Sequence, residues 1–253
     1  MTIFFITFII LLLIGVPISI SIGASAVLGC LVLDYPLMVI GQKMVTGVDS
    51  YLLIAIPLFI LAGNLMNAGK ITDKIFSFAK ELVGWIPGGL GHANIVASII
   101  FAGMSGSAAA DAGGLGTIEM EAMTKNGYRD NFSGAVTAAS SVIGPIFPPS
   151  IPLIIYGATA SVSVAKLFMG GVLPGLLMGV ALMVLVFIFA VKYRFERHPF
   201  DIIALSKQFF GSILSLITPL IILAGFTSGS FTPTEASSIA VAYSLVIAVV
   251  VYH

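Results

Sequence analysis

Charge is scarce in this sequence. Only 9% of its 253 residues are charged, and 11 basic side chains are balanced by 11 acidic ones. Soluble domains carry about 25% charged residues. The deficit excludes an ordinary soluble domain, and the even balance leaves no basic surface of the kind that binds nucleic acid.

Cysteines and common enzyme motifs are also nearly absent. Cys30 is the single cysteine and lies in an apolar run, so neither a disulfide framework nor a cysteine zinc site exists. No Walker A motif occurs, and "GMSGS" departs from G-x-S-x-G because Ser107 occupies the last glycine position. "GGLG" lacks the third glycine of a dinucleotide fingerprint. The chain is therefore not expected to be an enzyme.

Long apolar runs dominate instead, since 58% of the residues are hydrophobic. A membrane-spanning helix needs about 20 such residues. Five uncharged runs fit or approach this length: Met1–Leu33, Ser50–Gly69, Phe132–Ala165, Leu167–Val191 and Ala236–Tyr252. The sequence predicts an all-α polytopic membrane protein. Because "GVP" breaks the first run, both a hairpin of two short helices and one kinked helix remain open for residues 1–33.

The segment that follows the second run is amphipathic. Ile71, Ile75, Phe78 and Leu82 recur at helical spacing, with lysines on the other faces. Trp85 stands where an aromatic residue at a membrane interface is expected. This pattern predicts a helix that lies along a membrane surface.

Two later runs are interrupted in their middle. The first, residues 88–120, contains "GMSGS", and each half is too short to cross a bilayer at about 1.5 Å per residue. A re-entrant helical hairpin fits it best. The second contains "GPIFPPSIP", whose four prolines predict a broken transmembrane helix.

Basic residues indicate the orientation of these segments. They cluster in three places, which the positive-inside tendency puts in the cytoplasm: residues 70–80, 125–129 and 192–207. A hairpin between the first two clusters enters and leaves on one side, as this arrangement requires. A full crossing there would put one basic cluster outside.

Non-helical backbone at membrane depth is tolerated where it is buried in protein or lines a wet cavity. Carbonyls freed by a broken helix are ligands for a dehydrated cation, and helix N-termini attract anions. The two breaks therefore predict a site for sodium and an anionic solute. The end of the chain repeats the order of its beginning, apolar run, turn and Ala/Ser-rich helix, which is typical of inverted repeats.

Several polar residues in the apolar segments also allow purely structural interpretations. Ser105 and Ser107 can bond back to their own helices, and Asp111 is either functional or the cap of the second hairpin helix. Asn64 and Asn94 are interpreted as interhelical hydrogen-bonding residues, and His92 as a histidine near an interface. Glu235 in "TPTE" is interpreted as part of an N-terminal helix cap.

Four blocks of the sequence closely resemble the large membrane (M) subunit of tripartite ATP-independent periplasmic (TRAP) transporters. They are "IPLFILAGNLMNAGKITDKI", "GGLGHANIVASIIFAGMSGSAAADAGGLGTIEMEAMTKNGY", "GAVTAASSVIGPIFPPSIPLIIYG" and "GSFTPTEASSIAVAYSLV". The resemblance implies a sodium-driven elevator transporter of the bacterial inner membrane. Its implied partners are a small membrane subunit and a periplasmic binding protein that delivers organic acids such as C4-dicarboxylates or sialic acid.

The resemblance also implies an organisation of the chain. Because family members continue beyond this chain's end, it corresponds to their N-terminal portion, with the second repeat incomplete. The implied parts are scaffold helices 1–69, an amphipathic arm 70–84, a transport part 85–191 (hairpin 88–122, broken helix 131–163, helix 167–191), a cytoplasmic loop 192–211 and the opening helices 212–253 of a second repeat.

The resemblance further assigns site residues. The sodium ligands would be Ser105 and the carbonyls of Gly144, Phe147 and Pro149, with sodium as coupling ion. The residues near the substrate, or bracing the hairpin tip, would be Ser107, Asp111, Ser141 and Ser150. Two alternatives stay open: a dicarboxylate or citrate carrier that needs no binding protein, and a truncated membrane remnant that does not transport.

Overall fold

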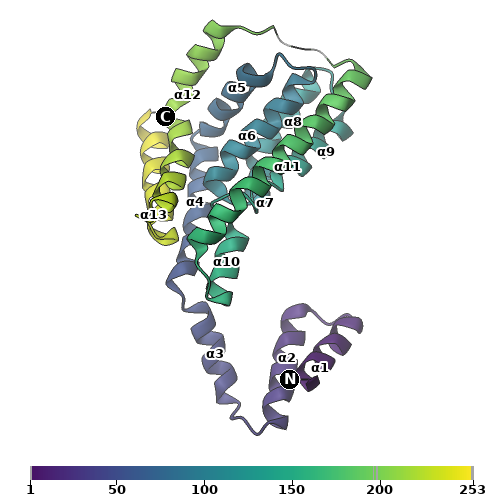
Figure 1. Cartoon of the computed structure of the whole chain (residues 1–253), viewed down its shortest axis with the longest axis vertical. Helices are drawn as coiled ribbons and strands as arrows, with labels where there is room; N and C mark the ends of the chain where they lie inside the picture. The colour runs from purple at the N-terminus through teal and green to yellow at the C-terminus, as the bar shows by residue number, and fades with distance from the viewer. Residues whose placement is uncertain (1, 196, 198, 252–253) are drawn as a thin grey trace. The chain divides into compact units, whose positions relative to one another are not determined.

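The computed structural model describes residues 2–195, 197 and 199–251, and this part of the chain is helical without strands. The prediction of an all-α protein is confirmed. The chain divides into two compact units, residues 1–50 and 51–253. Figure 1 labels the helices of both units.

The first unit contains α1 (Thr2–Leu13), α2 (Ile18–Val32) and α3 (Met38–Val48). A turn at Gly15, whose φ is +88°, separates α1 from α2, and the two helices pack against each other. Of the two alternatives for residues 1–33, the structure therefore has the hairpin of two short helices. Residues 34–49, which follow this hairpin, include the helix α3.

Among the described residues of the second unit, four helical segments have the length and apolar composition of membrane spans. They are η1 with α4 (Tyr51–Ile54, Ala55–Ala68), α11 (Val164–Tyr193), α12 (Ile202–Thr227), and α13 with η3 (Pro233–Val246, Ile247–Val251). Helix α13 packs along α4, and the Thr234 hydroxyl donates a hydrogen bond to the Tyr51 carbonyl at 2.8 Å. Glu235 and Thr232 form a capping box at the start of α13, so the predicted cap is confirmed.

Helix α12 begins earlier than the sequence indicated. The Asp201 carboxylate caps it by accepting bonds from the amides of Ile203 and Ala204. The expected loop 192–211 is therefore wrong in its bounds, because α11 continues to Tyr193 and α12 starts at Ile202.

The amphipathic segment forms α5 (Ile71–Val83), which packs against α6 and α12 (Figure 1). Ile71, Ile75 and Ala79 are fully buried on its apolar face. The Ser212 hydroxyl of α12 donates a hydrogen bond to the Lys74 carbonyl at 2.9 Å. The apolar face of α5 is thus covered by protein, and a position of this helix at the membrane surface stays a prediction.

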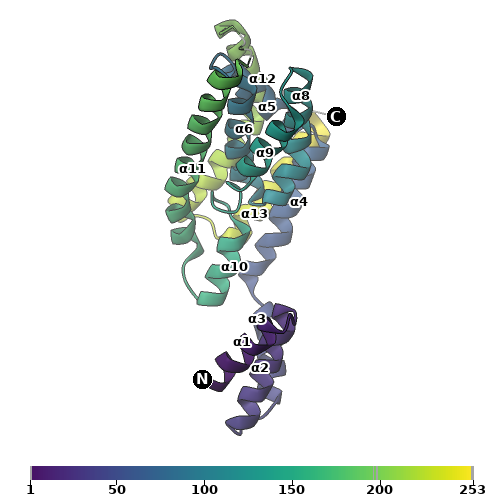
Figure 2. The same ribbon diagram turned by 90° about the vertical axis from the view of Figure 1, so that its right-hand side faces the viewer.

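The hairpin consists of α6 (Gly89–Ser105), α7 (Ala108–Ala110), the π-helical turn η2 (Asp111–Leu115) and α8 (Gly116–Lys125). In Figures 1 and 2, α6 begins and α8 ends at the same end of the unit. The chain then continues through α9 (Asp130–Ser141), an irregular stretch and α10 (Ile151–Ala160). The observed hairpin extends to Lys125 rather than to residue 122.

Candidate functional site

The tip of the hairpin contacts the break between α9 and α10. The Gly106 carbonyl accepts a hydrogen bond from the Ile151 amide at 3.3 Å. Gly106 has φ +61°, and a Cβ added there would lie 2.2 Å from the Pro149 carbonyl oxygen. A Cβ added at Gly144 would lie 3.3 Å from the Ser107 carbonyl carbon. Glycines therefore permit backbone-to-backbone contact between the two broken elements.

Proline and glycine leave several carbonyls of the break without partners. Pro145, Pro148 and Pro149 have no amide hydrogen to donate, and the Pro148–Pro149 bond is cis. In the part of the chain that the structure describes, the carbonyls of Gly144, Phe147 and Pro149 accept no hydrogen bond. These are the three carbonyls that the sequence resemblance assigned to sodium.

Long helix α11 covers the other side of the break. The Phe147 ring packs on Gly175, where an added Cβ would lie 3.0 Å from the ring, and a Cβ at Gly171 would lie 2.3 Å from the Ile146 carbonyl. The break is thus enclosed in protein, which is the condition for irregular backbone in a membrane.

The serines of the break use their hydroxyls locally. Ser150 caps α10 by accepting from the Leu153 amide, and its hydroxyl donates to the Pro145 carbonyl. Ser141 is buried and donates to the Ala138 carbonyl of its own helix at 3.0 Å. Both serines stabilise the shape of the break in this conformation.

The two serines of the tip differ. Ser107 is the N-cap of α7 and accepts from the Ala110 amide at 3.3 Å, with its side chain half-buried. Ser105 is 0% exposed and its hydroxyl has no partner within the described chain. Its Cβ would lie 3.2 Å from a Cβ added at Gly63, so the Ser105 side chain lies against α4.

Asp111 is not the N-cap of the second hairpin helix, so that alternative is wrong: Ser107 occupies the N-cap position. Asp111 lies in the π-helical turn, is 1% exposed and has Ser98 beside it. Neither of its carboxylate oxygens has a hydrogen bond of acceptable geometry in the described residues. The carboxylate is therefore held in the interior of the hairpin.

A chain of hydrogen bonds joins α6 to α9 behind the tip. Ser98 donates to Ser140 at 3.1 Å, Ser140 to the Asn94 side-chain oxygen at 2.7 Å, and Asn94 to the Thr137 hydroxyl at 2.8 Å. The prediction that Asn94 bonds between helices is confirmed. The same prediction for Asn64 is wrong, because that side chain is exposed on α4.

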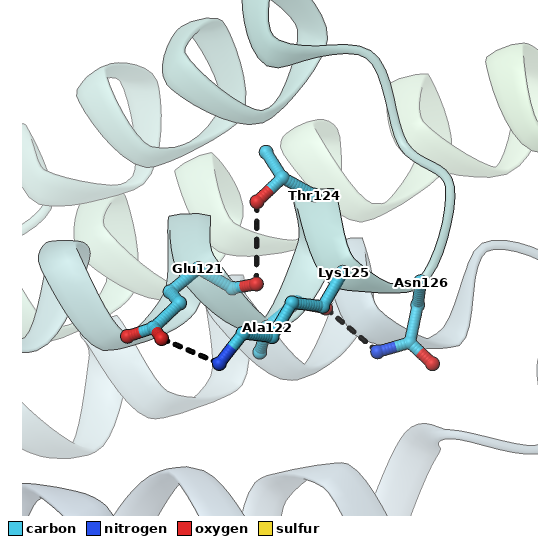
Figure 3. A network of polar contacts seen from close by, with 5 residues as sticks. All are labelled: Glu121, Ala122, Thr124, Lys125 and Asn126. Carbon is cyan, nitrogen blue, oxygen red and sulfur yellow. Dashed lines mark hydrogen bonds and ion pairs between the residues drawn. The ribbon is translucent and has the colours of Figure 1, made fainter.

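Glu119 is a buried residue that the sequence interpretation missed. It is 0% exposed, whereas Glu121 on the next face of α8 is exposed and pairs with Lys125 (Figure 3). The Lys125 ammonium lowers the pKa of the Glu121 carboxyl. A usable signal existed, because Gly116, Glu119 and Met123 share one face of the helix and all three are buried.

The chain matches a known protein family and several known proteins. The profile of the family described as tripartite ATP-independent periplasmic transporter, DctM component, matches residues 5–253. The sialic acid TRAP transporter large permease protein SiaM of Vibrio cholerae is 49% identical over 216 residues, 84% of this chain and 50% of that protein.

Two further relatives differ in their stated substrates. The sialic acid TRAP transporter permease protein SiaT of Haemophilus influenzae is 50% identical over 212 residues, 83% of this chain and 34% of that protein. The C4-dicarboxylate TRAP transporter large permease protein DctM of Vibrio cholerae is 38% identical over 249 residues, 96% of this chain and 54% of that protein. The chain spans about half the length of most curated relatives it matches.

Proposed function

Since the chain belongs to the DctM component family of tripartite ATP-independent periplasmic transporters, we propose that it takes part in sodium-coupled uptake of an organic acid. It is a multi-pass protein of the bacterial inner membrane, with four helical segments of spanning length in its second unit. Its relatives are named as transporter permeases.

The observation that carries the sodium assignment is the set of unbonded carbonyls in the break. Gly144, Phe147 and Pro149 each offer a carbonyl oxygen that accepts no hydrogen bond among the described residues. The C-terminal ends of α6 and α9, at Ser105 and Ser141, are also the partially negative ends of their helix dipoles. Unwound carbonyls and helix C-terminal ends together are a cation site in transporters of this kind.

Ser105 adds a hydroxyl to this set. It is buried without a partner among the described residues, so it has a lone pair to offer to sodium. Ser107, Ser141 and Ser150 border the same breaks and are assigned to the neighbourhood of the organic acid, and Asp111 braces the tip from behind. The N-terminus of α10 at Ser150 presents the positive end of a dipole, which attracts a carboxylate.

The substrate class follows from the relatives. The substrates named for the three relatives described above are sialic acid and C4-dicarboxylates, which are carboxylates. The proposed partners are the small membrane subunit and a periplasmic binding protein, and the proposed mechanism is an elevator movement of the hairpin and broken helix. The chain spans 50% of the length of one relative, so transport by the whole assembly is part of the proposal.

The test is uptake of labelled carboxylates into proteoliposomes that contain this chain with the membrane subunits of its own transporter. Uptake that requires both an inward sodium gradient and the binding protein supports the proposal. Sodium-driven uptake without a binding protein identifies the alternative carrier. Assembly with the small subunit but no uptake under any gradient identifies a membrane remnant.

A further inference from the structure

The hairpin contains two buried carboxylates, and neither is a ligand of the proposed sodium site. Asp111 is 1% exposed and Glu119 is 0% exposed. Within the described chain, neither oxygen of either carboxylate has a hydrogen bond of acceptable geometry. Two acidic groups are thus removed from solvent without the bonds that normally compensate for burial.

Both side chains face the hydrogen-bonded chain that joins α6 to α9. Glu119 lies between Gly116 and Met123 on the buried face of α8. A Cβ added at Gly116 would lie 2.6 Å from the Thr137 methyl, and the Met123 sulfur is 4.0 Å from the Asn94 side-chain nitrogen. Helical spacing therefore directs Glu119 toward these two polar residues.

Asp111, in the π-helical turn, is the second buried carboxylate of this region. It lies beside Ser98 and close enough to Glu119 for the two carboxylates to interact electrostatically. Ser98 bonds Ser140 at 3.1 Å, and its hydroxyl also lies within reach of the Asp111 carboxylate. The polar groups around the pair are neutral side chains.

Among the described residues, neither buried carboxylate forms a salt bridge with a cationic side chain. On α6 the single titratable residue is His92, which lies two positions from Asn94 and so on a different face of the helix. Helices α4 and α7 contain no charged residue. The remaining charged residues on the elements around the pair are exposed or half-buried: Glu121 and Lys125 on α8, Asp130 on α9, and Asp73, Lys74, Lys80 and Glu81 on α5.

Two neighbouring buried carboxylates cannot both stay ionised without a counter-charge. We propose that Asp111 and Glu119 form a proton-binding site in the core of the hairpin, in which at least one of the two is a carboxylic acid. The proton comes from water and returns to it, and no other bond changes. A proton needs no added volume, which suits the close contact between Gly116 and Thr137.

The site links protonation to the packing of the hairpin. The proton is taken up when α8 packs on α6 and α9, and it is released when the pair becomes accessible to water. This inference is independent of the sodium site, because it concerns Asp111 and Glu119 behind the tip and needs no transport.

The experiment is infrared spectroscopy of the purified full chain in lipid nanodiscs in D2O at neutral pH. We expect the carbonyl stretch of a protonated carboxylic acid in the wild type, lost or shifted in Glu119→Gln and unchanged in the exposed control Glu121→Gln. Asp111→Asn, with the same readout, replaces Glu119→Gln if that variant does not fold. Absence of the band in the wild type, or a band unchanged in both core variants, overturns the proposal.

A second measurement distinguishes a protonated pair of carboxylates from an ionised pair that binds a metal cation. The infrared spectrum of the wild type and the melting temperature of each variant are measured in sodium chloride and in choline chloride. If the wild type has no acid band, and sodium stabilises the wild type but not Glu119→Gln, the pair is ionised around a cation and the proposal is wrong. An acid band that persists in both salts supports it.

Discussion

The amide of Ile151 donates a hydrogen bond to the carbonyl of Gly106 at 3.3 Å, so the first residue of α10 is tied to the tip of the hairpin. The bond joins the two places where helices of the second unit are interrupted. After the end of α6, the Gly106 carbonyl needs a hydrogen-bond donor, and at the start of α10 the Ile151 amide needs an acceptor. The bond between them satisfies both groups. The two breaks act as one structural element.

Substitution of Gly106 by alanine is expected to weaken this contact strongly. The residue has φ +61°, which costs a non-glycine residue about 1–2 kcal/mol. The new Cβ would also lie 2.2 Å from the Pro149 carbonyl oxygen. Thermal unfolding of the purified chain in detergent measures the loss. Gly113→Ala is the matched control, because a Cβ there meets nothing within 4 Å, and equal effects of both substitutions would contradict the packing described.

The breaks themselves are predictable from the sequence because their causes are local. Glycine and proline interrupt a helix wherever they cluster, so the residues of "GMSGS" and "GPIFPPSIP" are sufficient to locate both sites. Which interruptions meet depends on contacts between residues far apart in the chain. The contact of Gly106 with Pro149 and the position of Ser105 against Gly63 therefore cannot be predicted from local patterns.

The two glutamates of α8 show a similar limit. Glu119 and Glu121 stand two positions apart in "TIEMEAM", and the same residue type is fully buried at one position and exposed at the other. Helical periodicity puts them on different faces, but only the packing of α6 and α9 decides which face is covered. The start of α12 was missed for another reason, because the Asp201 cap lies in a segment whose basic residues resembled a loop.

Ser105→Ala and Gly144→Leu are expected to raise the sodium concentration for half-maximal uptake in the complete transporter. Ser105 loses its unpartnered hydroxyl, and a leucine at Gly144 has no room beside Ser107. We expect a shift of roughly tenfold, which corresponds to about 1.4 kcal/mol of sodium binding. The control is Ser77→Ala, whose hydroxyl bonds the Asp73 carbonyl within α5. If the sodium dependence of uptake is unchanged in both variants at normal expression, the breaks serve the packing of the helices and do not bind sodium.

Lys125 and Lys166 are expected to lie on opposite sides of the membrane. Tyr128, just after α8, stacks on Phe195, just after α11, with ring centroids 4.2 Å apart. Lys166 is in the first turn of α11, a helix of 30 residues, which at about 1.5 Å per residue is long enough to cross the bilayer.

The measurement for this topology is cysteine labelling of intact cells in a Cys30→Ala background. An impermeant reagent added from outside should label a cysteine at position 166 and leave one at position 125 unmodified. Permeabilised cells serve as the control for reactivity at both positions. Labelling of position 125 from outside would invert the orientation that the basic clusters predict.

Asn94→Ala is expected to destabilise the hairpin by breaking the chain of hydrogen bonds behind its tip. The Asn94 side chain accepts from Ser140 at 2.7 Å and donates to Thr137 at 2.8 Å, and all three residues are buried. Its removal leaves buried partners unsatisfied, which costs about 1–3 kcal/mol per group. Thermal unfolding of the purified chain should therefore show a clear decrease in melting temperature. Asn64→Ala provides the matched control, because Asn64 is exposed on α4. A decrease of similar size in both variants would mean that the network contributes nothing specific to the packing of α6 on α9.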